Sequence, residues 1–315
     1  MAYDKQERPD RKEEIRKMLA LIRLEIFKLR RQAKTYIALI ALNALPIISF
    51  IISLLVVFRL KTYHLENLIP YDSIQEIYKF LLLCHLKALN WLMPFFLVML
   101  IADMISGELA RGTIKTLILR PVTRSQVLTA KIITVMLFLM LTVFFGAFIL
   151  QCNLVFLKWT ILRPEYIKDL VQDAGIIPFD ALVELFFVAF CVNLTVVCFC
   201  AMISVFTHSS TLSMALTILI LLIFYSWAIL DPIIAAIFDK FYLGGYTQLS
   251  KYLFTYSIER LTDLEFLDTV LKVSKPGSYV PAEIPMKRHL AVLAAYTCGF
   301  VFFCYYYFNR RDILS

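Results

Sequence analysis

Residues 101–131 read IADMISGELARGTIKTLILRPVTRSQVLTAK and join two long apolar stretches of the chain. A link between two membrane helices needs only a few polar residues, whereas the polar part of this one extends over residues 106–127. The basic side chains of residues 101–131 are Arg111, Lys115, Arg120, Arg124 and Lys131. This length and patterning are typical of a short amphipathic helix at a membrane surface. We call residues 106–127 the hook and expect a cytosolic partner to bind it.

The composition of the chain predicts a polytopic membrane protein. Of its 315 residues 60% are hydrophobic and its mean hydropathy is +0.75, whereas a soluble domain is about 45–50% apolar. Runs of about twenty apolar residues recur along the chain, which is the length that crosses a bilayer as a helix. We therefore predict an all-α, six-helix transmembrane domain over residues 36–308. The predicted spans are 36–58, 82–105, 128–156, 182–206, 211–230 and 290–308.

The distribution of charge predicts the orientation. If both termini are cytoplasmic, the inner segments are 1–35, 106–127, 207–210 and the tail 309–315. With charges at span edges assigned to the nearest side, the inner parts carry 18 basic and 9 acidic residues, a net of +9. The outer parts carry 14 basic and 15 acidic residues, a net of −1. Basic residues accumulate on the cytoplasmic side, so we predict N-in/C-in topology with a large outer loop over 231–289. The overall charge of +8 then reflects topology and attraction to the bilayer, not nucleic-acid binding.

The N-terminal region, residues 1–35, is predicted to form a cytoplasmic amphipathic helix. Apolar residues recur at helical spacing, and basic residues occupy many of the other positions. The apolar stripe consists of Ile15, Met18, Leu19, Ile22, Ile26 and Leu29. Such a helix lies at the membrane interface and leads into the first span. The alternative is a solvated helix whose stripe arises by chance.

No residue set in the sequence indicates catalysis. The chain lacks the HExxH and GxSxG motifs and the GxxxxGK[ST] loop that cradles phosphates. Its seven cysteines and four histidines show no metal-ligand spacing. We therefore expect no catalytic residue, no metal site and no cofactor bound by this chain. ATP, if it drives the protein, must be bound by a partner.

Two uncharged polar residues lie in the middle of predicted spans. Asn43 falls in the first span and Asn193 in the fourth. They could line a transport pathway, or they could form hydrogen bonds to neighbouring helices. An ion-coupled carrier normally places ionisable groups deep in the bilayer, whereas the acids here lie at span edges.

The hook resembles the signature of the ABC-2 family of ATP-binding-cassette transporter permeases. That signature comprises an acid, a Gly-Thr step, a leucine-rich turn, a Pro-Val-Ser/Thr-Arg sequence and a lysine that opens the third span. The corresponding residues here are Glu108, Gly112-Thr113, Leu117, Pro121-Val122-Thr123-Arg124 and Lys131. The ending Asn309-Arg310-Arg311-Asp312-Ile313 also resembles the family.

This resemblance implies a fold like the type V exporters, with a connecting helix before the first span and a coupling helix in the hook. It implies two permeases, identical or paralogous, and two cytosolic ABC ATPase subunits that hold ATP and Mg²⁺. The residues it assigns to ATPase coupling are Glu108, Gly112, Thr113, Lys115, Leu117, Arg120, Pro121 and Arg124.

The resemblance implies export, and the Phe- and Leu-rich spans with few fixed charges favour an amphiphile as the substrate, such as a peptide antibiotic, a lipid or a drug. The resemblance places the protein in the plasma membrane, as a multi-pass protein of a bacterial cell. Two alternatives remain open: a non-transporting membrane sensor or scaffold coupled to an ABC ATPase, and an ion-coupled carrier.

Overall fold

All regular secondary structure that the structure describes is helical, as predicted. The computed structural model describes residues 11–62, 80–113, 122–161, 179–240, 253–261 and 286–310. Five helices within these ranges are long and apolar enough to cross a membrane, and each overlaps a predicted span. They are Ala33–Leu55, Phe80–Ala110, Arg124–Phe156, Leu182–Phe206 and Met286–Arg310.

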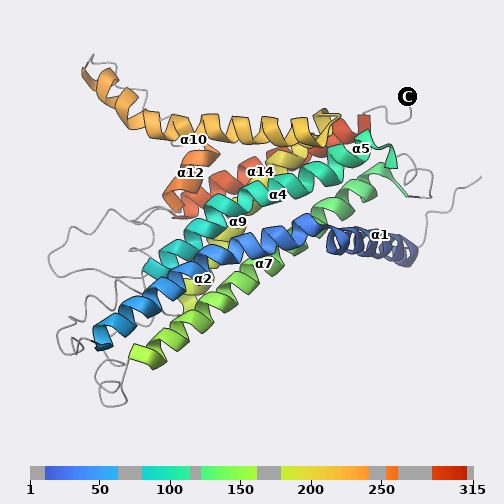
Figure 1. Ribbon diagram of the computed structural model, residues 1–315. Helices are drawn as coiled ribbons and strands as arrows, with labels where there is room; N and C mark the ends of the chain where they lie inside the picture. The colour runs from blue at the N-terminus through green and yellow to red at the C-terminus, as the bar shows by residue number, and fades with distance from the viewer. Residues whose placement is uncertain are drawn as a thin grey trace, which may run out of the picture.

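The long helices form one elongated bundle (Figure 1). They are α2 (Ala33–Thr62), the helical run Phe80–Ala110, α7 (Arg124–Ile161), α9 (Phe179–Phe206), α10 (Ser210–Lys240) and α14 (Met286–Arg310). Helix α9 packs against α14, α7 and α10 and against the middle of the Phe80–Ala110 run. A short helix, α12 (Phe254–Leu261), packs against α14 and α10.

Helix α10 differs from the prediction for this region. We expected the outer loop to begin at Asp231, but α10 continues through Asp231 and Pro232 to Lys240. Apolar residues 233–238 prolong the helical pattern after the proline, which removes only one backbone hydrogen bond, so the first part of the predicted loop is helical. The apolar part of α10 that the structure describes, Ser210–Phe224, is shorter than the other five candidate spans.

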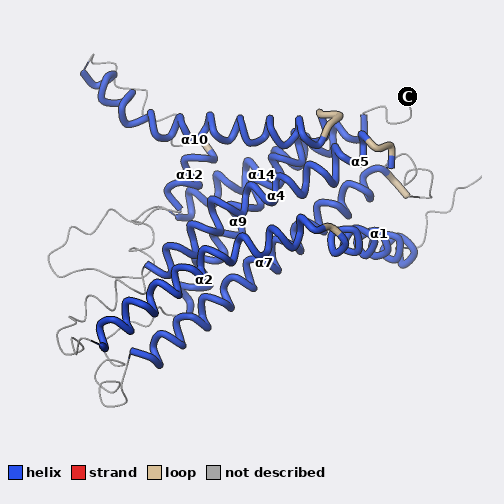
Figure 2. Tube along the Cα trace, in the orientation of Figure 1, coloured by secondary structure: helices blue, strands red, loops and turns tan. Residues whose placement is uncertain are grey.

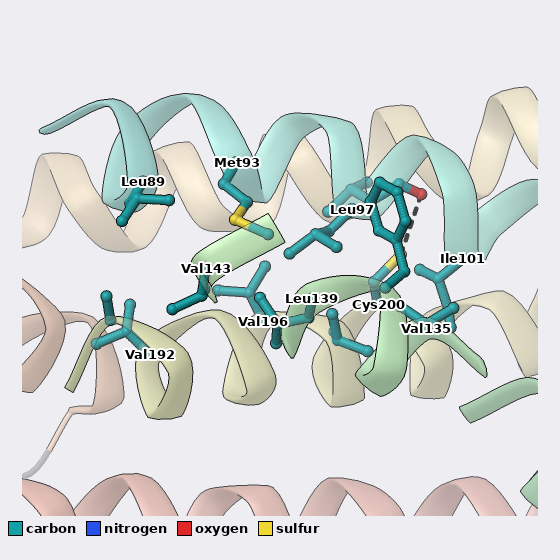
Figure 3. Packing of buried hydrophobic residues seen from close by; sticks show 14 of the residues in the cluster. Leu89, Met93, Leu97, Ile101, Val135, Leu139, Val143, Val192, Val196 and Cys200 are labelled. Atoms are coloured by element: carbon teal, nitrogen blue, oxygen red, sulfur yellow. Dashed lines mark hydrogen bonds between the residues drawn. The ribbon is translucent and has the colours of Figure 1, made fainter. Parts of the chain in front are cut away.

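The core is built from rows of apolar residues spaced four apart (Figure 3). The rows are Leu89, Met93, Leu97 and Ile101 in the second span, Val135, Leu139 and Val143 on α7, and Val192, Val196 and Cys200 on α9. Side chains at this spacing form ridges that pack into the grooves of a neighbouring helix. The Cys200 thiol also donates a hydrogen bond to the Val98 carbonyl, with the sulfur 3.6 Å from the oxygen. These rows join three helices into one unit.

The second span is an irregular helix. It contains two π-helical segments, η2 (Ala88–Leu92) and η3 (Asp103–Gly107), which flank α4 (Met93–Ala102), and it ends in the short helix α5 (Glu108–Ala110). Pro94, which has no N–H to donate, lies in the first turn of α4 directly after η2. Segments of π-helix alter the ladder of backbone bonds and often occur at functional sites. The second of them leads directly into the hook.

The N-terminal helix α1 (Arg11–Arg31) lies at one end of the bundle, together with α5, the start of α7 and the end of α14 (Figure 1). A short non-helical step at Gln32 separates α1 from α2 (Figure 2). At the same end, Arg124 Nη1 donates to the Asn309 carbonyl at 3.5 Å. Both flanks of the hook and the last described turn of the chain therefore share this end.

The face of α1 that packs on α7 coincides only in part with the predicted apolar stripe. Leu21, Glu25 and Leu29 are buried, and the stripe residues Met18 and Ile22 are partly buried beside Leu21. Ile15 and Leu19 are 53% and 60% exposed, as they would be on a helix whose other side meets a membrane surface. Helix α1 thus has two non-equivalent faces, and the inward one carries an acid.

Candidate functional site

Lys131 is the centre of a buried ionic cluster at this end of the bundle. It lies in the second turn of α7 and is 1% exposed. Its Nζ atom donates to Glu108 Oε2 at 2.6 Å and to Glu25 Oε1 at 3.2 Å. Glu108 belongs to α5 and Glu25 to α1, so one lysine joins three helices.

Lys28 of α1 is the fourth residue of this cluster, and its side chain is more exposed than that of Lys131. Its Nζ atom donates to Glu108 Oε1 at 2.8 Å and to Glu25 Oε1 at 3.0 Å. Each carboxylate therefore accepts from both lysines. The sequence led us to expect that Glu108 pairs with a basic residue of the hook or of the N-terminal helix, and Lys28 of α1 is such a partner. We call Glu25, Lys28, Glu108 and Lys131 the ionic cluster.

The charges of the ionic cluster balance, because it contains two lysines and two glutamates. Burial disfavours the charged form of Lys28, but its hydrogen bond to Glu108 and the nearby carboxylates outweigh this effect and raise its pKa. Withdrawing several charges from water is costly, and their mutual attraction compensates only if all of them stay paired. The cluster therefore favours one docked position of α1 on α5 and α7.

A second ionic site lies beside the first. Lys34, at the start of α2, donates to Asp103 of η3, and Arg111 Nη2 donates to the other oxygen of Asp103 at 3.3 Å. Arg111 Nε also donates to the Gly107 carbonyl at 3.1 Å. A Cβ atom at Gly107 would lie 2.6 Å from Asp103 Oδ1, so glycine leaves room for this carboxylate. The start of α2 is thereby bound to the beginning of the hook.

The Gly-Thr step of the hook terminates the helix that carries Glu108. Gly112 has φ of +68°, in the left-handed region where glycine is favoured, and its N–H donates to the Leu109 carbonyl at 3.1 Å. Thr113 Oγ1 donates to the Glu108 carbonyl at 3.2 Å. No described residue lies within 4 Å of a Cβ atom built at Gly112, so in the described part of the chain the requirement for glycine is conformational.

Comparison with known families identifies the chain. The profile described as ABC-2 family transporter protein matches residues 19–313, which is nearly the whole sequence. This chain belongs to the ABC-2 family. A search of curated proteins found no match. The chain is thus a multi-pass membrane protein of the permease type, and members of this family act with ABC ATPases.

The remaining hook residues of this ABC-2 protein divide into two groups. Arg124 begins α7, contacts the Asn309 carbonyl and so lies beside the end of α14. Lys115, Leu117, Arg120 and Pro121 lie outside the described residues, as does the short helix that we expected there. The structure therefore places Glu108, Gly112, Thr113 and Arg124 at one end of the bundle and leaves their role in coupling a prediction.

The two asparagines of the ABC-2 bundle both contact helix backbone. Asn193 Nδ2 donates to the Leu89 carbonyl of η2 at 3.1 Å and to the Ala189 carbonyl of its own helix at 2.8 Å. Asn43 Nδ2 donates to the Leu39 carbonyl, also within its own helix, at 2.7 Å. These contacts are those of a helix-bridging amide for Asn193, while a place on the transport pathway stays a prediction for both residues.

Six residues of these ionic sites were not among those predicted for the site: Glu25, Lys28, Lys34, Asp103, Arg111 and Lys131. One signal was available, because Glu25 is the single acid between residues 15 and 34 of the sequence. It lies four residues from both Leu21 and Leu29, which places all three on one face of the helix. An acid on an apolar face of a basic helix indicates a buried cationic partner.

Proposed function

We propose that this chain is the permease subunit of an ABC exporter and that the ionic cluster transmits movement from the ATPase to the bundle. The observation that carries the proposal is the pair of bonds that join Glu108 of the hook to Lys28 of α1 and to Lys131 of α7. A partner that pulls on the hook pulls first on Glu108. Because both carboxylate oxygens of Glu108 are bound, α1 and α7 follow.

Movement then spreads through packed helices. Helix α7 contacts α9 along the core rows, and α9 contacts α14 and α10. Interdigitated side chains transmit displacement because a close-packed interior deforms little. Closure of two ATPases against each other would therefore rock the bundle as a unit. The bulk of this subunit need not contact nucleotide.

The arrangement of the complex is part of the same proposal. We infer six spans, with α10 as the fifth, and a cytoplasmic location for α1, the hook and the tail. Two cytosolic ATPase subunits hold ATP and Mg²⁺, and a second permease, identical or paralogous, completes the pathway. The complex lies in a bacterial plasma membrane and moves an amphiphilic substrate outward. The basic excess on the hook side supports this orientation.

The test begins with the complex as it occurs in the cell. An affinity-tagged chain is purified in mild detergent, and co-purified subunits are identified and assayed for ATP hydrolysis. Probes at Arg23 on α1 and on the second permease then report the separation of the two bundles with and without vanadate-trapped nucleotide. We expect an ATPase in the complex and a nucleotide-dependent change in separation.

The decisive variant is Glu108→Ala, with Glu184→Ala on the exposed face of α9 as the control. Glu108→Ala should abolish or strongly reduce the nucleotide-dependent change while the protein still reaches the membrane. Glu184→Ala should behave as the native protein does. A complex without any ATPase, or a Glu108→Ala protein that responds normally, would contradict the proposal.

A further inference from the structure

A deep groove lies between α7 and α9, away from the ionic cluster. Its volume is about 550 Å³, within the range of small-molecule sites in proteins. It is lined by Met140, Val143, Phe144, Ala147, Phe148, Gln151, Leu182, Val183, Phe186, Phe187 and Phe190. Among the described residues that line the groove, none is charged and Gln151 is the single polar one. The groove lies within two candidate membrane spans.

The shape of the groove follows from the residues that form it. Val143 and Phe186 are buried and form its floor, beside the small side chain of Ala147. Phe144, Phe148 and Phe187 form its rim and are 72%, 59% and 54% exposed. A slot between projecting aromatic rings has apolar surface on both sides as well as below. Such a slot surrounds a thin chain and does not simply present a flat face.

We propose that this groove is a binding site for one acyl chain of a bilayer phospholipid. The uncharged lining matches an uncharged chain and disfavours any charged ligand group, whose transfer there would cost its hydration. Water cannot satisfy its hydrogen bonds against an apolar lining, whereas hydrocarbon is the surrounding medium. A helix of a second copy, about 10–12 Å wide, is the competing occupant that the experiment distinguishes.

The position of Gln151 fixes the direction of the bound lipid. It lies seven residues beyond Phe144 on α7, or about 10 Å along the helix axis, toward the end opposite the ionic cluster. Its amide can hydrogen-bond the ester oxygens where the chain joins the headgroup. The lipid therefore occupies the leaflet at that end of the bundle. This site goes beyond the proposed transport function and does not depend on it.

The experiment uses the full chain in vesicles of phosphatidylcholine and phosphatidylglycerol that contain a small fraction of phosphatidylcholine with a mid-chain diazirine. After illumination, cross-linked peptides are identified by mass spectrometry. We expect cross-links to concentrate on residues 143–148 and 186–190. A free fatty acid with the same diazirine forms a second arm, and it should label the groove less than the phospholipid does.

The variant Ala147→Trp fills the floor, and Ala294→Trp on an exposed face of α14 is the matched control. Loss of contact with about two methylene groups lowers affinity roughly tenfold, so Ala147→Trp should lower cross-linking in the groove about tenfold. Ala294→Trp should leave it unchanged. The proposal is overturned by equal cross-linking over all lipid-facing helices, by insensitivity to Ala147→Trp, or by protein–protein cross-links that show a second copy in the groove.

Discussion

Lys131 shows how a single side chain can define an interface between helices. It is almost completely buried, and its charge is balanced by carboxylates that come from two other helices. One of these partners, Glu25, has an oxygen, Oε2, without a hydrogen-bond partner among the described residues. Any change in the number of charges therefore leaves at least one group buried and uncompensated.

Substituting Lys131 tests this balance. Lys131→Met should destabilise the protein by about 3–5 kcal/mol, because it leaves Glu25 and Glu108 as facing anions with Lys28 alone. The double variant Lys131→Met/Glu108→Gln restores a net charge of zero and should recover part of the loss. Thermal unfolding in detergent measures both, with Lys287→Met on the exposed face of α14 as a control. A double variant no more stable than Lys131→Met alone would refute the charge-balance argument.

The two asparagines provide a second comparison at the residue scale. Asn193 bonds to another segment, η2, whereas the bond that Asn43 makes among the described residues lies within its own helix. An interhelical hydrogen bond in a membrane protein contributes about 0.6–1.7 kcal/mol, so Asn193→Leu should be destabilising by this amount and Asn43→Leu by less. Unfolding measurements and transport by the assembled complex should be compared. If Asn193→Leu assembles normally but transports poorly, the amide serves the pathway instead of the packing.

At the scale of elements, hydropathy located the helices well but did not determine their faces. The fourth span was predicted at 182–206, and α9 occupies Phe179–Phe206. In α1, by contrast, the stripe is divided: Ile15 and Leu19 are exposed, as a membrane-facing stripe would be, whereas Met18 and Ile22 pack toward the bundle. Lipid and protein core are both apolar, so periodicity cannot distinguish them.

The ionic cluster could not be predicted from the sequence, for a different reason. Lys28 and Glu108 are 80 residues apart, and Lys131 and Glu25 are 106 apart, so no local spacing relates them. The family signature did include Glu108 and Lys131, but only the packing of α1 on α7 shows that they share a partner. The Gly-Thr step was recognised as a motif, and the positive φ of Gly112 gives its physical reason.

Docking of α1 should depend on pH through Lys28. Its pKa is raised in the folded protein, so its contribution is complete below the ordinary value of 10.5 and is lost as pH rises above that value. Spin labels at Arg16 and Asn309 should therefore report a constant separation from pH 7 to about pH 10 and a longer, broader distribution above it. Lys28→Met removes this contribution and should show the broader distribution already at pH 7. A separation in Lys28→Met that is native-like throughout would exclude Lys28 as the cause.

At the scale of the whole molecule, one end of the bundle carries α1, both flanks of the hook and the last turn of α14 (Figure 1). This arrangement predicts that these parts lie on one side of the membrane. It does not by itself specify which side. The charge split of +9 against −1 predicts that the side is cytoplasmic, because basic segments are retained there. Whether these parts share one side of the membrane, and whether that side is cytoplasmic, can therefore be tested independently.

Cysteine labelling tests the shared side and the cytoplasmic orientation separately. In a variant whose native cysteines are replaced, single cysteines at Ser125 and Asn309 should react with a membrane-impermeant maleimide only from the cytosolic side. A cysteine at Asp173, between α7 and α9, should react only from outside, because the chain crosses the bilayer once between it and Ser125. Reaction of all three sites from one side would show that α7 does not span. If all three cysteines react only from the side opposite to that predicted, the arrangement of the bundle is kept but the predicted orientation is wrong. The hook would then be out of reach of a cytosolic ATPase.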